Sequence, residues 1–215
     1  MLISGKEKRI GVLVSGGGTN LQALIDAEKE GRLGKGKIHL VISSKTGVYA
    51  LQRAERSGIE AMVIARTDYE SISDYSEALA DALIGKNIDL VVLAGFLTII
   101  DEKMYDKFQG RIINVHPALI PSFCGKGYYG LHVHEAALEK GVKISGATVH
   151  IVTPECDGGP IIMQKAVEVK EEDTPQTLQR RIMEEAEWKI LPEAVRLFCD
   201  DKIIIKNNKA YIKGD

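Results

Sequence analysis

Long apolar runs are absent from this sequence of 215 residues. The chain starts MLISGKEKR, where charges interrupt the apolar residues, and no later run approaches the roughly 20 apolar residues that a membrane helix requires. Clusters of one charge are also missing, because 28 basic and 30 acidic residues are scattered along the chain and leave a net charge of -2. A surface that follows a nucleic-acid backbone needs concentrated positive charge. We therefore expect neither a membrane nor a nucleic acid as a partner.

Cysteines are few and show no pairing pattern. Cys124, Cys156 and Cys199 are odd in number, far apart in the chain and free of C-x-x-C spacing. Disulfide frameworks belong to oxidising compartments, whereas thiols stay free in the cytosol. The sequence therefore predicts a cytoplasmic protein. Repeats, low-complexity tracts and linkers are missing too, so we expect a single domain over residues 1–215.

Short runs rich in Val, Ile and Leu alternate with helical patterns in the first half of the chain. Such strands are typical of a parallel sheet that is buried on both faces by crossover helices. We expect a doubly wound, mostly parallel α/β sheet of the Rossmann-like type over about residues 1–110. The predicted strands are residues 9–14, 37–42, 60–64, 89–94 and 111–115, and the predicted helices are residues 48–57, 69–84 and 102–108, with a further capped helix after Thr19 and Asn20.

The second half, about residues 111–215, has a different pattern. Residues 146–152 and 160–169 read as strands, and the connection between them is too short for a crossover helix, so they should pair as an antiparallel hairpin. A short helix over 135–139 precedes them. A long helix over 175–198 should be capped by Thr174 and kinked at Pro192. Residues 203–205 and 210–212 predict a terminal hairpin.

The turn Ser15-Gly16-Gly17-Gly18-Thr19-Asn20 joins the first strand to the first helix. Glycines and a helix N-terminus at such a place favour an anion such as phosphate. A dinucleotide fingerprint is missing, because Leu21 stands where the last glycine should be and the second strand ends in Ser43-Ser44-Lys45 without an acid. The alternative is a tight turn without a ligand.

Asn114 and His116 are two residues apart at the end of a predicted strand, so their side chains share one face at the ligand-binding edge of the sheet. A carboxamide and an imidazole suit an oxygen that gains negative charge in acyl transfer, and the imidazole can also move a proton. A nearby Asp157 would raise the pKa of His116. Taken singly, Asn-x-His-Pro and Asp-Gly-Gly are also ordinary turn chemistry.

The remaining histidines have simpler interpretations. His132 and His134 lack a third ligand, so we expect no metal site and a solvated junction between loop and helix. His39 and His150 lie inside predicted strands and read as core or edge residues. Covalent catalysis has no sequence support, because no G-x-S-x-G elbow and no Cys-His motif occurs.

Four ordered motifs carry a resemblance over nearly the whole chain. They are VLVSGGGTNL at 12–21, VVLAGF at 91–96, NVHP at 114–117, and GATVH at 146–150 with DGGP at 157–160. With them the sequence resembles the phosphoribosylglycinamide formyltransferases. The resemblance implies a cytoplasmic transferase of purine biosynthesis that moves a formyl group from 10-formyltetrahydrofolate to the amine of glycinamide ribonucleotide. It implies small-molecule partners, no metal, and a monomer or a homodimer.

The resemblance also assigns residues. Asn114, His116 and Asp157 would be catalytic, with His116 as proton donor. The ribonucleotide would contact Gly18, Thr19, Asn20 and Glu187. The folate would lie against Leu97, Thr98, Ile99, Ile100, Asn114, Thr153, Pro154, Glu155, Cys156 and Asp157.

The sequence departs from that family in three places. Thr98 stands where many relatives have Arg, Ala118 where Ser is usual, and the segment 122–130 is longer than the common loop. Glycines and tyrosines in this segment predict a mobile lid near the folate.

Three other functions compete with this interpretation. Formyltetrahydrofolate hydrolases share the Asn, His and Asp set but carry an extra N-terminal domain, and here the first strand begins at Arg9. Methionyl-tRNA formyltransferases need a basic RNA-binding domain. A phosphate-binding module without turnover would keep the fold, but loss of one catalytic residue would then be expected.

Overall fold

A mixed seven-stranded sheet forms the centre of the computed structural model, which describes residues 6–214. Its strand order is β3-β2-β1-β4-β5-β6-β7, in which β1 to β5 are parallel and β6 and β7 are antiparallel to their neighbours. The strands are β1 (Lys8–Val14), β2 (Gly36–Ser43), β3 (Glu60–Val63), β4 (Leu90–Leu93), β5 (Ile112–His116), β6 (Ile144–Ile151) and β7 (Ile161–Glu168). The predicted mostly parallel sheet with an antiparallel C-terminal part is confirmed.

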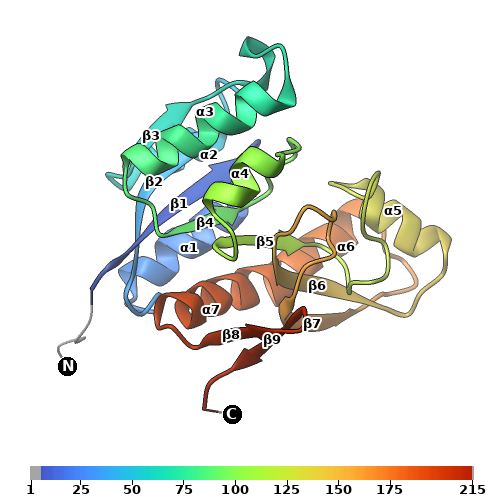
Figure 1. The fold of residues 1–215 in the computed structure, drawn as a ribbon. Helices are drawn as coiled ribbons and strands as arrows, with labels where there is room; N and C mark the ends of the chain where they lie inside the picture. Colours follow the sequence, from blue (N-terminus) through green and yellow to red (C-terminus); the bar gives the residue numbers. More distant parts are fainter. Residues whose placement is uncertain (1–5, 215) are drawn as a thin grey trace.

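Helices cover both faces of this sheet (Figure 1). Alternate residues of β1 point to opposite sides: Ile10 and Val12 join the apolar cluster under α1, α2, α6 and α7, whereas Leu13 joins the cluster under α3 and α4. Each such fully buried side chain contributes about 1.5–3 kcal/mol to folding. The helical segments are α1 (Thr19–Lys29), α2 (Tyr49–Arg56), the 3₁₀ turn η1 (Arg66–Asp68), α3 (Ile72–Gly85), α4 (Glu102–Lys107), α5 (His132–Glu139), α6 (Pro175–Ile182), the π-helical segment η2 (Met183–Glu187) and α7 (Trp188–Cys199).

The reversal of strand order lies between β1 and β4, which are neighbours although β2 and β3 separate them in sequence. Loops that leave the carboxyl ends of two such strands diverge and leave a crevice where α/β proteins bind ligands. The glycine turn follows β1 here, and the segment from Gly95 to Ile100 follows β4. A hydrogen bond from Leu97 N to Ser15 Oγ, 3.0 Å long, ties these two loops together.

The long C-terminal helix begins as predicted and is interrupted at a different place. Thr174 caps it, because its side chain accepts from Thr177 N and Thr177 returns a bond to the Thr174 backbone. The π-helical turn Met183–Glu187 interrupts it, and Pro192, at which we expected a kink, lies within α7. Pro192 has no N–H to donate to the carbonyl of Trp188. The wider π turn ends at Glu187, directly before Trp188.

The chain ends in the predicted hairpin, formed by β8 (Ile203–Lys206) and β9 (Lys209–Ile212). Asn207 and Asn208 both have positive φ, as the tight turn of such a hairpin requires. In the part of the chain that the structure describes, no helix combines the length and the apolar character needed to cross a membrane.

Candidate active site

The glycine turn positions the start of α1 as an anion-binding element. The first helical hydrogen bond runs from Gln22 N to Gly18 O. The backbone amides of residues 19–21 therefore have no acceptor within the helix. Gly18 has φ of 71°, and a Cβ there would lie 2.7 Å from the Cβ of Ala50 on α2, so only glycine fits. A left-handed residue followed by helical ones directs successive N–H groups into one concavity. The predicted side-chain cap is wrong, because Gly18 itself is the N-cap residue.

Asn20 and Glu187 form a buried pair beside this turn. The Asn20 amide donates to Glu187 Oε2 over 2.6 Å, and the two residues are only 7% and 5% exposed. The side chain of Asn20 is therefore committed to Glu187, and an anion at the turn would meet its backbone amide. Burial raises the pKa of Glu187 to about 7, against a smaller opposing contribution from Asn20. The structure thus brings two of the predicted ribonucleotide residues together.

The buried carboxyl of Glu187 is expected to reduce stability at high pH. Its pKa rises from 4.5 to about 7 on folding, so its contribution is fully favourable below pH 4.5 and is lost as the pH rises through about 7. Glu187→Gln keeps an acceptor for Asn20 and cannot ionise. We expect it to raise the free energy of unfolding by up to about 3 kcal/mol at pH 8 and by little at pH 5, measured by urea denaturation.

Glu184→Gln is the matched control, because Glu184 is exposed on the same helical segment. Its unfolding free energy should follow that of the unmodified protein at both pH values. A gain from Glu187→Gln that is the same at pH 5 and pH 8 would contradict the ionisation argument.

The second part of the site lies on one face of β5 and β6. Asn114 pairs with His150 and His116 pairs with Thr148 across the antiparallel ladder. Side chains at such positions point to the same face of the sheet, opposite the face that carries Val115 and Val149. His150, interpreted from the sequence as a core or edge residue, is buried and adjoins the predicted catalytic residues. The available signal was the two-residue spacing of Thr148 and His150 in a strand beside β5.

Asp157 completes this cluster from the loop between β6 and β7. Its carboxylate lies between two imidazoles, with Oδ2 3.7 Å from His116 Nδ1 and Oδ1 3.5 Å from His150 Nε2. The loop is tight: Asp157 has φ of 55°, and a Cβ on Gly159 would run into the carbonyl of Ile151. The three predicted catalytic residues are thus brought together, and His150 joins them.

The charges of the cluster differ in one respect from expectation. The pKa of Asp157 falls to about 2: burial opposes ionisation, but hydrogen bonds from His150 and from the Gly125 amide outweigh it. The pKa of His116 was expected to rise and is instead lowered, because burial disfavours its charged form more than Asp157 favours it. His116 is only 4% exposed. At neutral pH the pair is therefore a carboxylate and a neutral imidazole.

A hydrogen bond fixes the tautomer of His116, and close contacts hold the ring of His150 in place. His116 Nε2 lies 2.8 Å from the carbonyl of Phe123, which can only accept, so Nε2 carries a proton and Nδ1 is left free to exchange one. His150 Nδ1 donates to the carbonyl of Ile151 over 3.0 Å. His150 Nε2 lies between two side chains, 3.2 Å from Asn114 Nδ2 and 3.5 Å from Asp157 Oδ1. This orients the Asn114 carboxamide with one N–H still available.

The long segment 122–130 contacts the cluster through its backbone. Phe123 supplies the carbonyl on His116, and the Gly125 amide donates to Asp157 Oδ2 over 2.8 Å. Phe123 has φ of 49°, which is uncommon for a residue with a side chain and turns its carbonyl toward the histidine. The segment is therefore part of the site itself. Its proposed motion as a lid stays a prediction.

The first predicted folate-binding segment, 97–100, carries exposed apolar side chains. Leu97 and Ile99 expose 55% and 67% of their surface, whereas Ile100 is buried. Val152, which precedes the loop 153–157, packs in the same apolar cluster as Ile100. Apolar side chains form most of the lining of small-molecule sites, so Leu97 and Ile99 are suited to contact an apolar ring.

The other histidines do not form a second site. His134 was expected in a solvated junction, but α5 already begins at His132 and places His134 in the interior with no hydrogen-bond partner for either ring nitrogen. Burial lowers its pKa to about 4. His39 contacts Glu7 and Arg9 far from Asp157 in the sheet. Within residues 6–214 no group of three or more His, Cys, Asp or Glu side chains is arranged to hold a metal ion.

Comparisons with known proteins agree on one family. The family model described as formyl transferase matches residues 8–195. Phosphoribosylglycinamide formyltransferase from Haemophilus influenzae is 38% identical over 207 residues, which cover 96% of this chain and 94% of the relative. Glycinamide ribonucleotide transformylase 1 from Symbiobacterium toebii superimposes with a TM-score of 0.91 at 44% identity, over 97% of this chain and 95% of that one.

A longer relative contains a region similar to this chain. The human trifunctional purine biosynthetic protein adenosine-3 is 41% identical over 94% of this chain. The chain spans only 19% of the length of that relative. The similarity therefore concerns one part of the larger protein.

Proposed function

The chain belongs to the formyl transferase family, and from this premise we propose that it transfers the formyl group of 10-formyltetrahydrofolate to the amine of glycinamide ribonucleotide. The observation that carries the proposal is the cluster of Asn114, His116, Asp157 and His150, in which both histidines are buried. Formyl transfer needs donors for an oxygen that becomes negative and a group that moves a proton, and this cluster supplies both.

The N-terminal half is proposed to hold the ribonucleotide. Its phosphate would accept from the amides at the start of α1, after Gly18, and the buried Glu187 would meet the rest of the molecule beside Asn20. The glycine turn follows β1 and the catalytic pair ends β5, and these parallel strands have their carboxyl ends at the same edge of the sheet. A ribonucleotide bound at the turn can thus direct its amine toward His116.

The folate is proposed to lie between the segment 97–100 and the loop 153–157. The exposed Leu97 and Ile99 fit a flat ring on one side. Among the described residues, the backbone amides of Thr153, Glu155 and Cys156 have no acceptor and can serve the ring's polar edge. Thr98 has no positive charge, so we do not propose that it pairs with the carboxylates of the folate. The co-substrate supplies the electrophilic formyl carbon.

Asn114, His116 and Asp157 have different proposed roles at the formyl carbon. Asn114 donates its free N–H to the formyl oxygen as negative charge develops. His116, neutral at pH 7, accepts at Nδ1 the proton that the attacking amine loses and passes it to the departing folate nitrogen. Asp157, ionised and 3.7 Å from Nδ1, stabilises the imidazolium while it exists. His116, expected from the resemblance as the proton donor, is thus proposed to act first as the base and then as the donor.

A direct assay tests the proposed function. The purified chain should consume 10-formyltetrahydrofolate, or a 10-formyl folate analogue, only when glycinamide ribonucleotide is present, as followed by absorbance. Consumption without the ribonucleotide would instead identify a hydrolase. No consumption under either condition, with both ligands bound, would favour a binding module.

The three free cysteines favour the cytosol as the place of this reaction.

A further inference from the structure

Arg53 on α2 lies directly against the glycine turn. Its Nε donates to the carbonyl of Gly17 over 2.9 Å. Its aliphatic chain passes Gly18 closely, since Cδ would be 3.5 Å from a Cβ at that position. The guanidinium also stacks over the ring of Tyr49, 4.7 Å from its centroid, which restricts its position. A cation is therefore held next to the amides that open α1.

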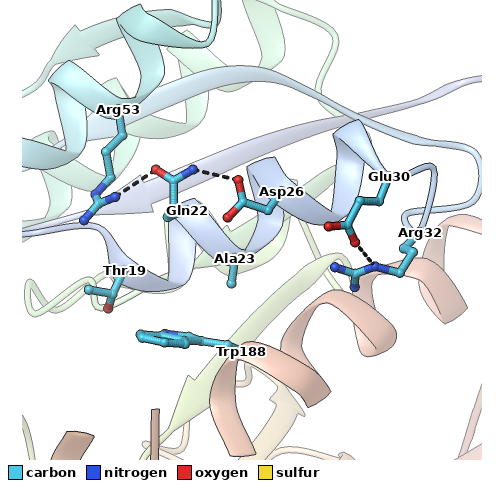
Figure 2. Close-up of a pocket in the computed structure, with 8 residues that line it drawn as sticks. All are labelled: Thr19, Gln22, Ala23, Asp26, Glu30, Arg32, Arg53 and Trp188. Carbon is cyan, nitrogen blue, oxygen red and sulfur yellow. Dashed lines mark hydrogen bonds and ion pairs between the residues drawn. The ribbon is translucent and has the colours of Figure 1, made fainter. Parts of the chain in front are cut away.

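The charge of Arg53 has no counter-ion among the residues that the structure describes. Within residues 6–214, no carboxylate lies within 4.0 Å of its guanidinium. Its Nη1 donates to the neutral Gln22 Oε1 over 2.8 Å, and Gln22 in turn donates to Asp26 (Figure 2). Nη2 has no hydrogen-bond partner among the described residues. Three of its five N–H donors, one on Nη1 and two on Nη2, and a full positive charge thus remain for a ligand from outside the chain.

A cavity of about 370 Å³ gives that ligand access. It is lined at one end by Thr19, the first residue of α1, with Arg53 above it and Trp188 opposite (Figure 2). Arg32 at the far end of the same cavity is already neutralised by Glu30. Of the two arginines that line this cavity, the unpaired one is therefore the one at the glycine turn.

Resting on the proposed function, we infer that Arg53 is a specificity-determining residue that binds the phosphate of the ribonucleotide from the side opposite the α1 amides. Backbone amides are neutral donors, whereas a phosphate monoester carries up to two negative charges near pH 7. The planar guanidinium matches two phosphate oxygens through Nη1 and Nη2. Arg53 then selects phosphorylated substrates over the corresponding uncharged ribosides.

The test is Arg53→Gln in steady-state assays with each substrate varied. The KM for glycinamide ribonucleotide should rise by about 10- to 100-fold, as for loss of a hydrogen bond to a charged group, while kcat and the KM for the formyl folate stay nearly unchanged. Arg53→Lys should recover part of the affinity. The inhibition constant of inorganic phosphate should rise in parallel.

Two controls separate this role from general charge effects. Arg56→Gln changes an exposed arginine of the same helix that contacts Tyr49, and Arg32→Gln changes the far end of the cavity. Both should leave the KM for the ribonucleotide unchanged. The proposal is overturned if Arg53→Gln leaves that KM unchanged, or if either control raises it equally.

The dephosphorylated substrate, glycinamide riboside, distinguishes phosphate recognition from simple support of the turn. If Arg53 acts on the phosphate, kcat/KM for the riboside is the same in the unmodified protein and in Arg53→Gln. An equal loss for both substrates would show a structural role and overturn the proposal. Calorimetric titration with inorganic phosphate tests Arg53 even if no formyl transfer occurs, so failure of the proposed function is recognised separately.

Discussion

Replacement of His116 by alanine is expected to lower kcat for formyl transfer by about 10²- to 10⁴-fold, the usual contribution of a positioned acid–base group. Without the imidazole, the proton of the amine loses the acceptor that Nδ1 provides 3.7 Å from Asp157 Oδ2. Binding of the ribonucleotide should persist, because the glycine turn and the buried pair Asn20 and Glu187 are on other elements. Stopped-flow turnover and calorimetric titration measure the two effects.

Folding needs a separate control here, because His116 is buried and hydrogen bonded to Phe123. His116→Asn retains a polar side chain, and both variants should unfold at temperatures near that of the unmodified protein. His39→Ala removes another strand histidine, away from the cluster, and should retain full turnover. Undiminished turnover in both His116 variants would refute the assigned role.

The pH dependence of the unmodified protein checks the same assignment. The neutral imidazole of His116 is the reactive form, and its pKa lies below the ordinary 6.5 because the ring is buried. Protonation as the pH falls through that lowered pKa removes the base. Activity should therefore hold through neutral pH and decline only below about 6.5. A decline that begins well above that pH would show that His116 is not the controlling base.

Asn114→Ala is expected to lower kcat by about 10²- to 10³-fold, the effect of losing one donor to a developing oxyanion. Asn114 Nδ2 is fixed by His150, so its free N–H is aimed before substrate arrives. The KM for the ribonucleotide should change little, because the interaction strengthens only as charge develops on the formyl oxygen.

Asn114→Asp sharpens this test. It has nearly the same shape, but it replaces the donor by a carboxylate beside the ionised Asp157. We expect a loss at least as large as that of Asn114→Ala. Equal kcat in Asn114→Asp and the unmodified protein would show that the side chain merely fills space between β5 and His150.

The location of His116 could be predicted from the sequence, but its charge state could not. The motif Asn114-Val115-His116-Pro117 fixed the face and the edge of the sheet, and Asp157 in its tight loop was a sound candidate partner. The predicted direction of the pKa shift was wrong, because burial of the ring outweighs the contributions of Asp157 and the Phe123 carbonyl, which both raise the pKa. Burial is a sum over many residues from distant segments, which no local motif records.

The roles of His150 and Arg53 also depend on contacts between segments that are distant in sequence. His150 was placed in a strand, but its contact with Asn114 follows from the register between β5 and β6, which a shift of one residue would reverse. Arg53 carries no motif at all, and its position depends on α2 packing against Gly18 through Ala50.

By itself, the sequence determined the alternation of strands and helices, the antiparallel hairpin and the Thr174 cap. It also singled out the glycine turn 15–20 and the pair Asn114 and His116 at the end of β5. These features depend on periodicity, turn chemistry and short spacings, which act within a few residues. Only the tertiary structure decided the charge states of His116 and Glu187, the burial of His134 and the unpaired charge of Arg53. Those properties arise from desolvation and from contacts between segments that are remote in sequence, so they exist only once the chain has folded.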